Sequence, residues 1–146
     1  MAAGADVWHI NRNGETCLTE AALGGHLELV QSLLNVDGVG LDPNHKNGKG
    51  QTALFNAAYN GHKEVVLLLL ENGADPTIRT KASVTQTLES PSGAALNEET
   101  RTIIDNWDVS KVVEIRREKE RIRDQKAEEA FRSDLEREQY YLRKKR

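Results

Sequence analysis

The chain has 146 residues, of which 29% are charged and 5% aromatic, and its formal net charge is −3 at pH 7. No apolar run approaches the roughly 18 residues of a membrane span, and the single cysteine, Cys17, excludes an internal disulfide. The first six residues are neither basic nor apolar enough for a signal peptide. We therefore expect a cytoplasmic location in a reducing compartment, without membrane contact.

Two stretches of the chain repeat each other. Residues 14–30 and 50–66 share Gly-x-Thr, a pair of alanines and Gly-His at a spacing of 36 residues. Gly-x-Asp signatures end at Asp6, Asp42 and Asp75, just ahead of each new unit, and the first unit carries three extra residues around Asn35–Gly40. Repeats of this length indicate stacked supersecondary units, in which each unit buries its apolar surface against its neighbours.

The second copy predicts a pair of short helices. Apolar residues at helical spacing favour a first helix with Leu54, Ala57 and Ala58 on one face, and Gly61 can end it in the left-handed conformation. The second helix has its apolar face at the positions i, i+1, i+4 and i+5, namely Val65, Val66, Leu69 and Leu70.

The order of turn, Gly-x-Thr, helix, Gly-His, second helix and Gly-Ala-Asp resembles the ankyrin repeat. The resemblance covers about residues 4–82, and we assign residues 1–82 to a domain of ankyrin repeats. It implies an all-α ankyrin-repeat solenoid. Its full units would span about 11–46 and 47–79, after a repeat-end remnant at 4–10. The family's Thr-Pro-Leu-His is replaced by Thr-Cys-Leu-Thr and Thr-Ala-Leu-Phe, so some local stability should be lost.

The third unit looks degenerate. Ser83 stands where the turn glycine belongs, and Ser90-Pro91 falls where the paired alanines belong. We assign residues 83–109 to this degenerate unit, which is expected to cap the stack. Most of Thr80–Leu96 is predicted to be a loop with one helical turn.

A helix is predicted at the end of this third unit. Asn97 is a suitable N-cap for a helix over Glu98–Asn106, because its amide oxygen can accept from a free backbone N–H. Ile103, Ile104 and Trp107 would form the apolar edge that closes the stack.

The last 37 residues, 110–146, predict one long charged helix. They include 22 charged residues and neither Gly nor Pro, and Asp108 or Ser110 would cap the helix. Oppositely charged pairs at i, i+3 and i, i+4 support helical spacing. Two short apolar stripes do not join into a heptad seam: Val112, Ile115 and Ile122, then Phe131, Leu135 and Leu142. A helix that reaches away to a partner fits better than a strong coiled coil.

The order of repeats, Trp107-Asp108-Val109-Ser110 and an Arg/Glu-rich helix resembles proteins that combine ankyrin repeats with an IQ calmodulin-binding motif. The segment Gln139–Arg143 argues against calmodulin as a partner of these residues, because Glu138 stands where Ile or Leu belongs.

Catalysis is not expected. Cys17 is interpreted as a small replacement for proline, and His26 and His62 hold the Gly-His position, where the resemblance implies local hydrogen bonding. We find neither a zinc-ligand spacing nor a phosphate-binding loop, so no cofactor or metal is predicted. The acidic repeats also argue against nucleic-acid binding.

The predicted function is a protein–protein interaction scaffold. In the ankyrin family the contact positions are the turn tips and the exposed side of the first helix. Carried onto this chain they are Arg12, Asn13, Glu15, Leu23, Lys46, Lys49, Gln51, Tyr59, Asn60 and Arg79. We add Leu67 and Leu68 to these contact positions, because the first unit has polar residues at the matching positions on the outer side of its second helix. The alternative is a structural component of a cytoskeletal or axonemal assembly, with a location at the cytoskeleton or cilium and the long helix lying along a polymer.

Overall fold

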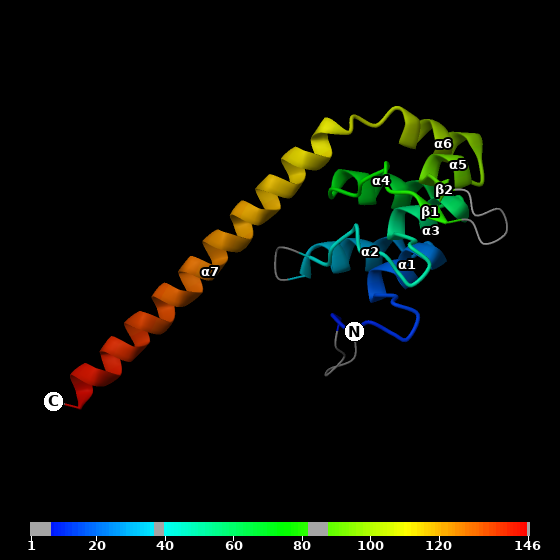
Figure 1. Cartoon of the computed structure of the whole chain (residues 1–146). Helices are drawn as coiled ribbons and strands as arrows, with labels where there is room; N and C mark the ends of the chain where they lie inside the picture. Colours follow the sequence, from blue (N-terminus) through cyan, green and yellow to red (C-terminus); the bar gives the residue numbers. More distant parts are fainter. Residues whose placement is uncertain (1–6, 37–39, 82–87, 146) are drawn as a thin grey trace.

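The computed structural model describes residues 7–36, 40–81 and 88–145. Three helix pairs are stacked side by side, and a single long helix runs away from them (Figure 1). The pairs are α1 (Cys17–Gly24) with α2 (Leu27–Leu34), α3 (Ala53–Tyr59) with α4 (Lys63–Glu71), and α5 (Pro91–Ala94) with α6 (Glu98–Asp105). The long helix is α7 (Ser110–Lys144). The Gly4-Ala5-Asp6 signature, Ser83 and part of the three-residue insertion lie outside the described residues.

A threonine caps the start of the first helix in both repeated pairs. The Thr16 hydroxyl accepts from the Thr19 N–H at 3.3 Å, and the Thr52 hydroxyl accepts from the Phe55 N–H at 3.2 Å. Each bond satisfies one of the N–H groups that a helix start leaves free. Gly61 follows α3 with φ +73°, which confirms the predicted left-handed ending.

The core lies between the helices of neighbouring units. Helix α1 packs on α3 and α3 on α5, while α2 packs on α4 and α4 on α6. The predicted apolar faces of the second unit are confirmed, since all seven of their side chains are buried: Leu54, Ala57, Ala58, Val65, Val66, Leu69 and Leu70. Each fully buried leucine or valine stabilises the fold by about 1.5–3 kcal/mol relative to an exposed one.

The expected register of the third unit is wrong. The Ser90 hydroxyl accepts from the Gly93 N–H at 3.1 Å, and Pro91 is the first residue of α5. Ser90 therefore corresponds to Thr16 and Thr52 as the cap of a first helix, rather than to an alanine. The preceding turn is longer and includes an unexpected two-residue ladder, in which β1 (Thr80–Lys81) pairs antiparallel with β2 (Leu88–Glu89).

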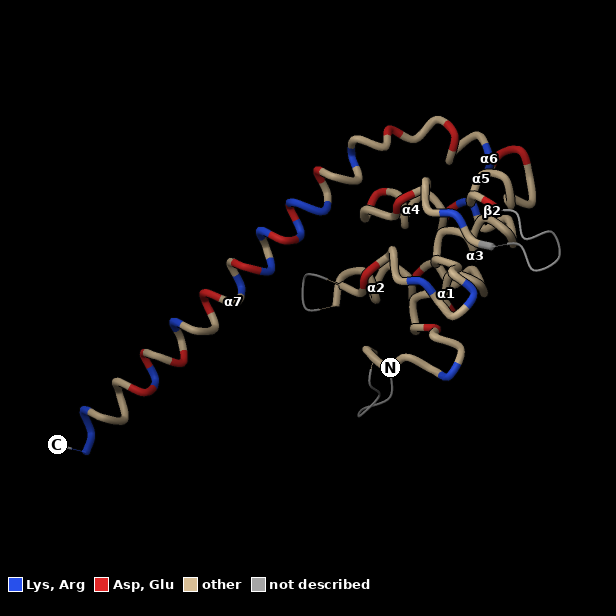
Figure 2. Tube along the Cα trace, in the orientation of Figure 1, with Lys and Arg blue, Asp and Glu red and all other residues tan. Residues whose placement is uncertain are grey.

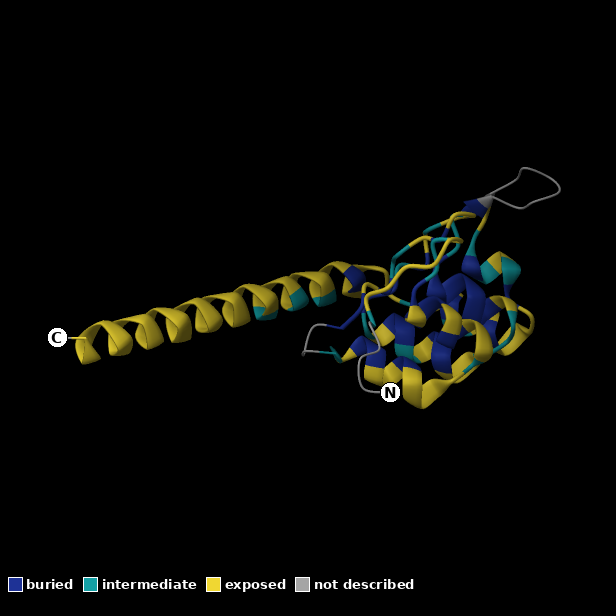
Figure 3. Ribbon diagram, turned by 90° about the horizontal axis from the view of Figure 1, so that it is seen from below, coloured by how far each residue is buried: buried dark blue, intermediate teal, exposed yellow. Residues whose placement is uncertain are grey.

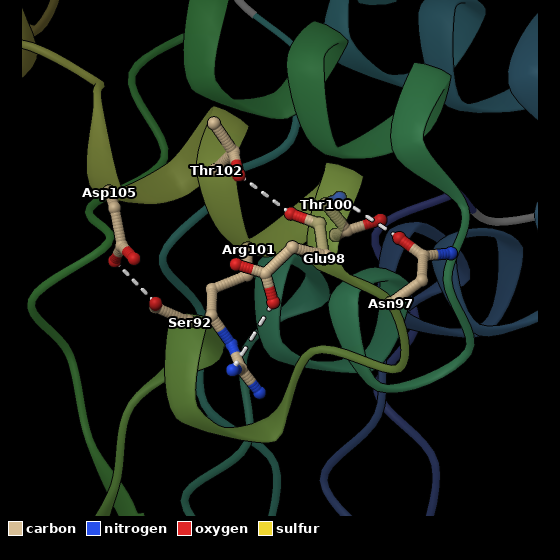
Figure 4. Close-up of polar contacts among 7 residues, drawn as sticks. All are labelled: Ser92, Asn97, Glu98, Thr100, Arg101, Thr102 and Asp105. Carbon is tan, nitrogen blue, oxygen red and sulfur yellow. Dashed lines mark hydrogen bonds and ion pairs between the residues drawn. The ribbon is translucent and has the colours of Figure 1, made fainter.

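Helix α6 closes the stack, as expected. The Asn97 side chain accepts from the Thr100 N–H at 2.9 Å and caps the helix. The Ser92 hydroxyl of α5 donates to the Asp105 carboxylate of α6, so a polar contact joins the two helices (Figure 4). Ile104 is buried in the core, and Trp107 packs against this core. The third pair therefore stacks as the first two do.

The predicted long helix is confirmed as the 35-residue α7, which is about 50 Å long at 1.5 Å per residue. Asp108 rather than Ser110 provides the cap, because its carboxylate accepts from the Ser110 N–H at 3.0 Å and the Ser110 hydroxyl at 2.7 Å. Val112 is buried, and Ile115 and Ile122 are half-buried. Beyond them the helix is exposed (Figure 3).

Candidate protein-binding face

The turns that join the units are hydrogen-bonded to one another. The Gly48 N–H donates to the Asn13 carbonyl at 2.8 Å, and the Thr80 hydroxyl donates to the Lys49 carbonyl at 2.8 Å. The His45 ring bonds the Gly14 carbonyl at 2.7 Å. These bonds connect the first turn to the second and the second to the third, so the turn tips form one row along the stack.

Basic side chains gather on this row. Arg12, Lys46, Lys49 and Arg79 are all exposed, and we call these four residues the basic turn row. They are four of the five Lys and Arg residues among the first 79, a stretch that also has nine Asp and Glu. Four of the nine acidic residues lie instead on the helices, namely Glu20, Glu28, Glu64 and Glu71 (Figure 2). Glu15, Asp42 and Asp75 also lie at the turns, so the four cations give the turns a small excess of positive charge, whereas the helices of the first two units are acidic.

The polar residues expected to bind at these turns also hold the turns together. The Asn47 side chain accepts from the Lys49 and Gln51 N–H groups, both at 2.9 Å, and donates to the Gln51 side-chain oxygen at 3.0 Å. The first turn repeats this arrangement, because the Asn11 amide donates to the Glu15 carboxylate at 3.1 Å. Glu15 and Gln51 thus stabilise their own turns.

An aromatic and an aliphatic side chain lie exposed on the first helices. Tyr59 of α3 is 59% exposed and stacks on Phe55, with ring centroids 6.3 Å apart. Leu23 of α1 is 41% exposed. They provide apolar surface on the first helices of neighbouring units.

Asn60 has a structural partner. Its side-chain amide donates to the Leu23 carbonyl at 3.1 Å, and the His62 ring approaches the same oxygen at 3.1 Å. His62 therefore bonds the preceding unit, whereas the resemblance implied a local contact. Both side chains connect α3 and α4 to α1, and neither belongs to a metal site.

The structure separates the two outer leucines. Leu67 is 40% exposed, as expected for a surface apolar residue. Leu68 is half-buried and packs against the core cluster, as Ile103 and Trp107 of the third unit do. An outer apolar patch would therefore rest on Leu67 and not on both residues.

Two carboxyl groups meet at the start of α1. A hydrogen bond between the side chains of Glu15 and Glu20 raises the pKa of Glu20 and lowers that of Glu15. A shared proton is the physical cause, since two adjacent carboxylates repel each other. This pair lies beside the first turn.

The described residues show neither a three-residue metal cluster nor a helix that could span a membrane. Over residues 7–36, 40–81 and 88–145, no three His, Cys, Asp or Glu side chains come together as a metal site. Within the same ranges, every helix is too short or too polar to cross a bilayer. The residues that the structure does bring together are those of the turn row and the first helices.

The repeated helix pairs agree with a comparison against protein families. The family model for ankyrin repeats in three copies matches residues 1–80, which is more than half of the chain. The chain belongs to the ankyrin-repeat family. A search of curated proteins found no match. The family match ends at residue 80 and gives no support to the resemblance with IQ-motif proteins.

Membership confirms the predicted all-α ankyrin-repeat solenoid and the coarse prediction of function. Ankyrin repeats suggest a role in protein–protein interaction, and the family is generally non-catalytic. The predicted contact residues, the domain boundaries and the cytoskeletal or ciliary location stay predictions. The sequence did not predict a strong coiled coil, and Phe131 in α7 is 71% exposed.

Proposed function

We propose that the protein is a non-catalytic scaffold that binds a protein segment across its basic turn row and the exposed first-helix side chains Leu23 and Tyr59. One observation carries the proposal: four exposed cations stand along hydrogen-bonded turns of an otherwise acidic stack. The potential along the turns would orient an approaching acidic segment. Aromatic and arginine side chains commonly account for most of the binding energy at such surfaces.

The chemistry of this surface favours a protein over a nucleic acid. Acidic side chains on the neighbouring helices, including Glu20, Glu28 and Glu64, would repel a continuous phosphate backbone. An extended protein segment with a few carboxylates and one apolar residue would instead place its carboxylates against the cations and its apolar residue against Tyr59.

The outer part of α7 would act as a second contact surface of the scaffold. Its exposed apolar side chains include Phe131, Leu135 and Leu142, and it extends beyond the stack (Figure 1). A helix of this length can connect the stack to a second body. The alternative function, a component of a cytoskeletal or axonemal polymer, would use this same surface.

Quantitative affinity capture tests the proposal. In one variant the basic turn row is neutralised by Arg12→Gln, Lys46→Gln, Lys49→Gln and Arg79→Gln. The matched control neutralises four exposed cations of α7, namely Arg117, Arg132, Arg143 and Lys144. A third chain ends at Gln125 and keeps the part of α7 that packs on the stack.

The turn-row variant should lose the proteins that the other two chains retain. If the turn-row variant captures the same proteins as the natural chain, and every one of them is lost with residues 126–146, the proposal is contradicted and the polymer alternative is favoured. Co-sedimentation with cytoskeletal filaments would then identify that alternative directly.

A further inference from the structure

A polar cleft lies between α7 and the stack, and it shares no residue with the basic turn row. Its volume is about 230 Å³, which is enough for a side chain but not for a folded element. One wall is formed by the chain after α2 and α4: Gly40, Leu41, Asp42, Pro43, Asn44, Asn72 and Gly73. The other wall is α7, with Arg116, Lys119, Glu120 and Arg123.

The first turns of α7 lie beside this wall and touch it at Gly73. Val112 is only 4% exposed. A methyl group of Ile115 lies close to Gly73. A Cβ atom added at Gly73 would be 3.1 Å from this methyl group. Lys111 adds a contact with the Trp107 ring, at 5.1 Å from its centroid. The cleft therefore lies just beyond the point where α7 contacts the stack.

Lys119 occupies an apolar position of this packed face. It follows Ile115 by four residues and precedes Ile122 by three, so the three side chains share one side of α7. Its ammonium is buried, and among the described residues no atom forms a hydrogen bond with it. Burial lowers the pKa of Lys119, while the charge of Asp42 opposes this effect. A buried cation without a partner destabilises a fold, so packing alone does not explain a lysine here.

The charges around Lys119 leave the cleft positive. Arg116 and Arg123 line it one turn before and after Lys119, and Asp42 and Glu120 are its two acidic residues. Asp42 already accepts the Asn44 N–H at 2.9 Å, which fixes its carboxylate in the turn. Three cations thus face two carboxylates, and the buried ammonium of Lys119, between the two arginines, has no hydrogen bond among the described residues.

The geometry points to a binding site for one carboxylate of a protein partner in this cleft, with the guanidinium groups of Arg116 and Arg123 and the ammonium of Lys119 as its donors. A guanidinium presents paired N–H groups that match the two oxygens of a carboxylate. A single carboxylate fits the small net positive charge, whereas Asp42 and Glu120 would repel a polyphosphate chain. The carboxylate belongs to an acidic side chain or to a chain terminus.

Peptide titration of the full-length chain, followed by NMR, tests this site and separates the two sources. One probe is a blocked pentapeptide with one central glutamate, and the second has glutamine there and a free terminal carboxylate. A third probe has glutamine and blocked ends, and the fourth is inorganic phosphate. At least one carboxylate peptide should shift the backbone amides of Asn44, Gly73 and Lys119, and the fully neutral peptide should not.

Three variants decide whether the cleft residues are responsible. Arg123→Gln and Lys119→Met should each weaken carboxylate binding by at least about tenfold, the loss expected for a charged hydrogen bond. Arg117→Gln is the matched control, because Arg117 is exposed on α7 and does not line the cleft, and it should bind as the natural chain does. Lys119→Met should also raise the melting temperature, since it removes a buried charge.

Several outcomes would overturn the site. These are no shift at the cleft with either carboxylate peptide, equal losses in Arg117→Gln and Arg123→Gln, or phosphate binding tighter than both peptides. A lower melting temperature for Lys119→Met with unchanged binding would show that the lysine is structural. None of these results depends on the basic turn row, so failure here is distinct from failure of the scaffold function.

Discussion

The side-chain amide of Asn60, at the end of α3, donates to the carbonyl of Leu23, in α1, at 3.1 Å. This contact joins the second unit to the first. At the next boundary the Leu96 N–H donates to the Ala58 carbonyl at 2.9 Å. Neighbouring units are thus connected by hydrogen bonds as well as by the apolar core.

Asn60→Ala should lower the free energy of unfolding by about 0.5–1.5 kcal/mol, the usual contribution of one hydrogen bond. Urea denaturation measures the change. Asn35→Ala is the control, because among the described residues the Asn35 side-chain amide donates to the Gln31 carbonyl, one turn earlier in its own unit. A loss for Asn60→Ala no larger than that for Asn35→Ala would show that the contact between units contributes little.

Gly73→Ala should destabilise the protein for two reasons. Gly73 has φ +95°, which is strained for any residue with a side chain, and a Cβ there would lie 3.1 Å from an Ile115 methyl. We expect a loss of about 1–3 kcal/mol in urea denaturation.

Ile115→Ala should offset part of that loss, because it removes the crowded methyl. In a double-mutant cycle, the changes in unfolding free energy for Gly73→Ala and Ile115→Ala should differ from additivity by at least about 0.5 kcal/mol. The changes for Gly73→Ala and Ile122→Ala should be additive. Additivity in both pairs would mean that α7 does not rest on Gly73.

The start of α7 should loosen at low pH. Hydrogen bonds from the Ser110 hydroxyl and N–H lower the pKa of Asp108 below its usual range. The ionised form is therefore favoured in the folded chain. Its stabilising effect is complete above the pKa of an unfolded aspartate and is lost as the pH falls through the lower folded value.

Amide exchange in the first turns of α7 should reveal this loss. Corrected for intrinsic rates, the protection of residues 111–113 should fall across that acidic range, and Asp108→Asn should remove the pH dependence. The same pH dependence in Asp108→Asn would assign it to another group.

Much of the second unit could be predicted from the sequence because its signals are local. The helical spacing of Leu54 and Ala58 and the turn at Gly61 depend on neighbours in the chain. The register of the third unit could not, because its turn is longer: Ser90 follows Thr52 by 38 residues, whereas Thr52 follows Thr16 by 36. The Ser-Pro pair was itself a helix-start signal that the fixed spacing obscured.

The packing of α7 on the stack could not be predicted from its own residues. The stripe of Val112, Ile115 and Ile122 is short, and Ile115 lies against Gly73, far away in the chain. Leu68 was assigned to the surface for a similar reason, since the core contact that half-buries it is visible only in the folded stack.

Tyr59→Ala combined with Arg79→Ala should weaken partner binding about tenfold or more, because both side chains are exposed at the proposed face. The free energy of unfolding should change by less than about 1 kcal/mol, which includes the loss of stacking on Phe55. Titration calorimetry with a captured partner and urea denaturation measure the two effects. A lower stability with unchanged affinity would make this face structural.

Hydrogen–deuterium exchange of the full-length chain, with and without a captured partner, tests the central claim most directly. Binding across the basic turn row and the first helices should protect residues 12–15, 46–51 and the exposed end of α3 near Tyr59. The outer faces of α2 and α4 should exchange as in the free chain. Protection confined to those outer faces or to residues 126–145 of α7, with the turns unchanged, would contradict the account.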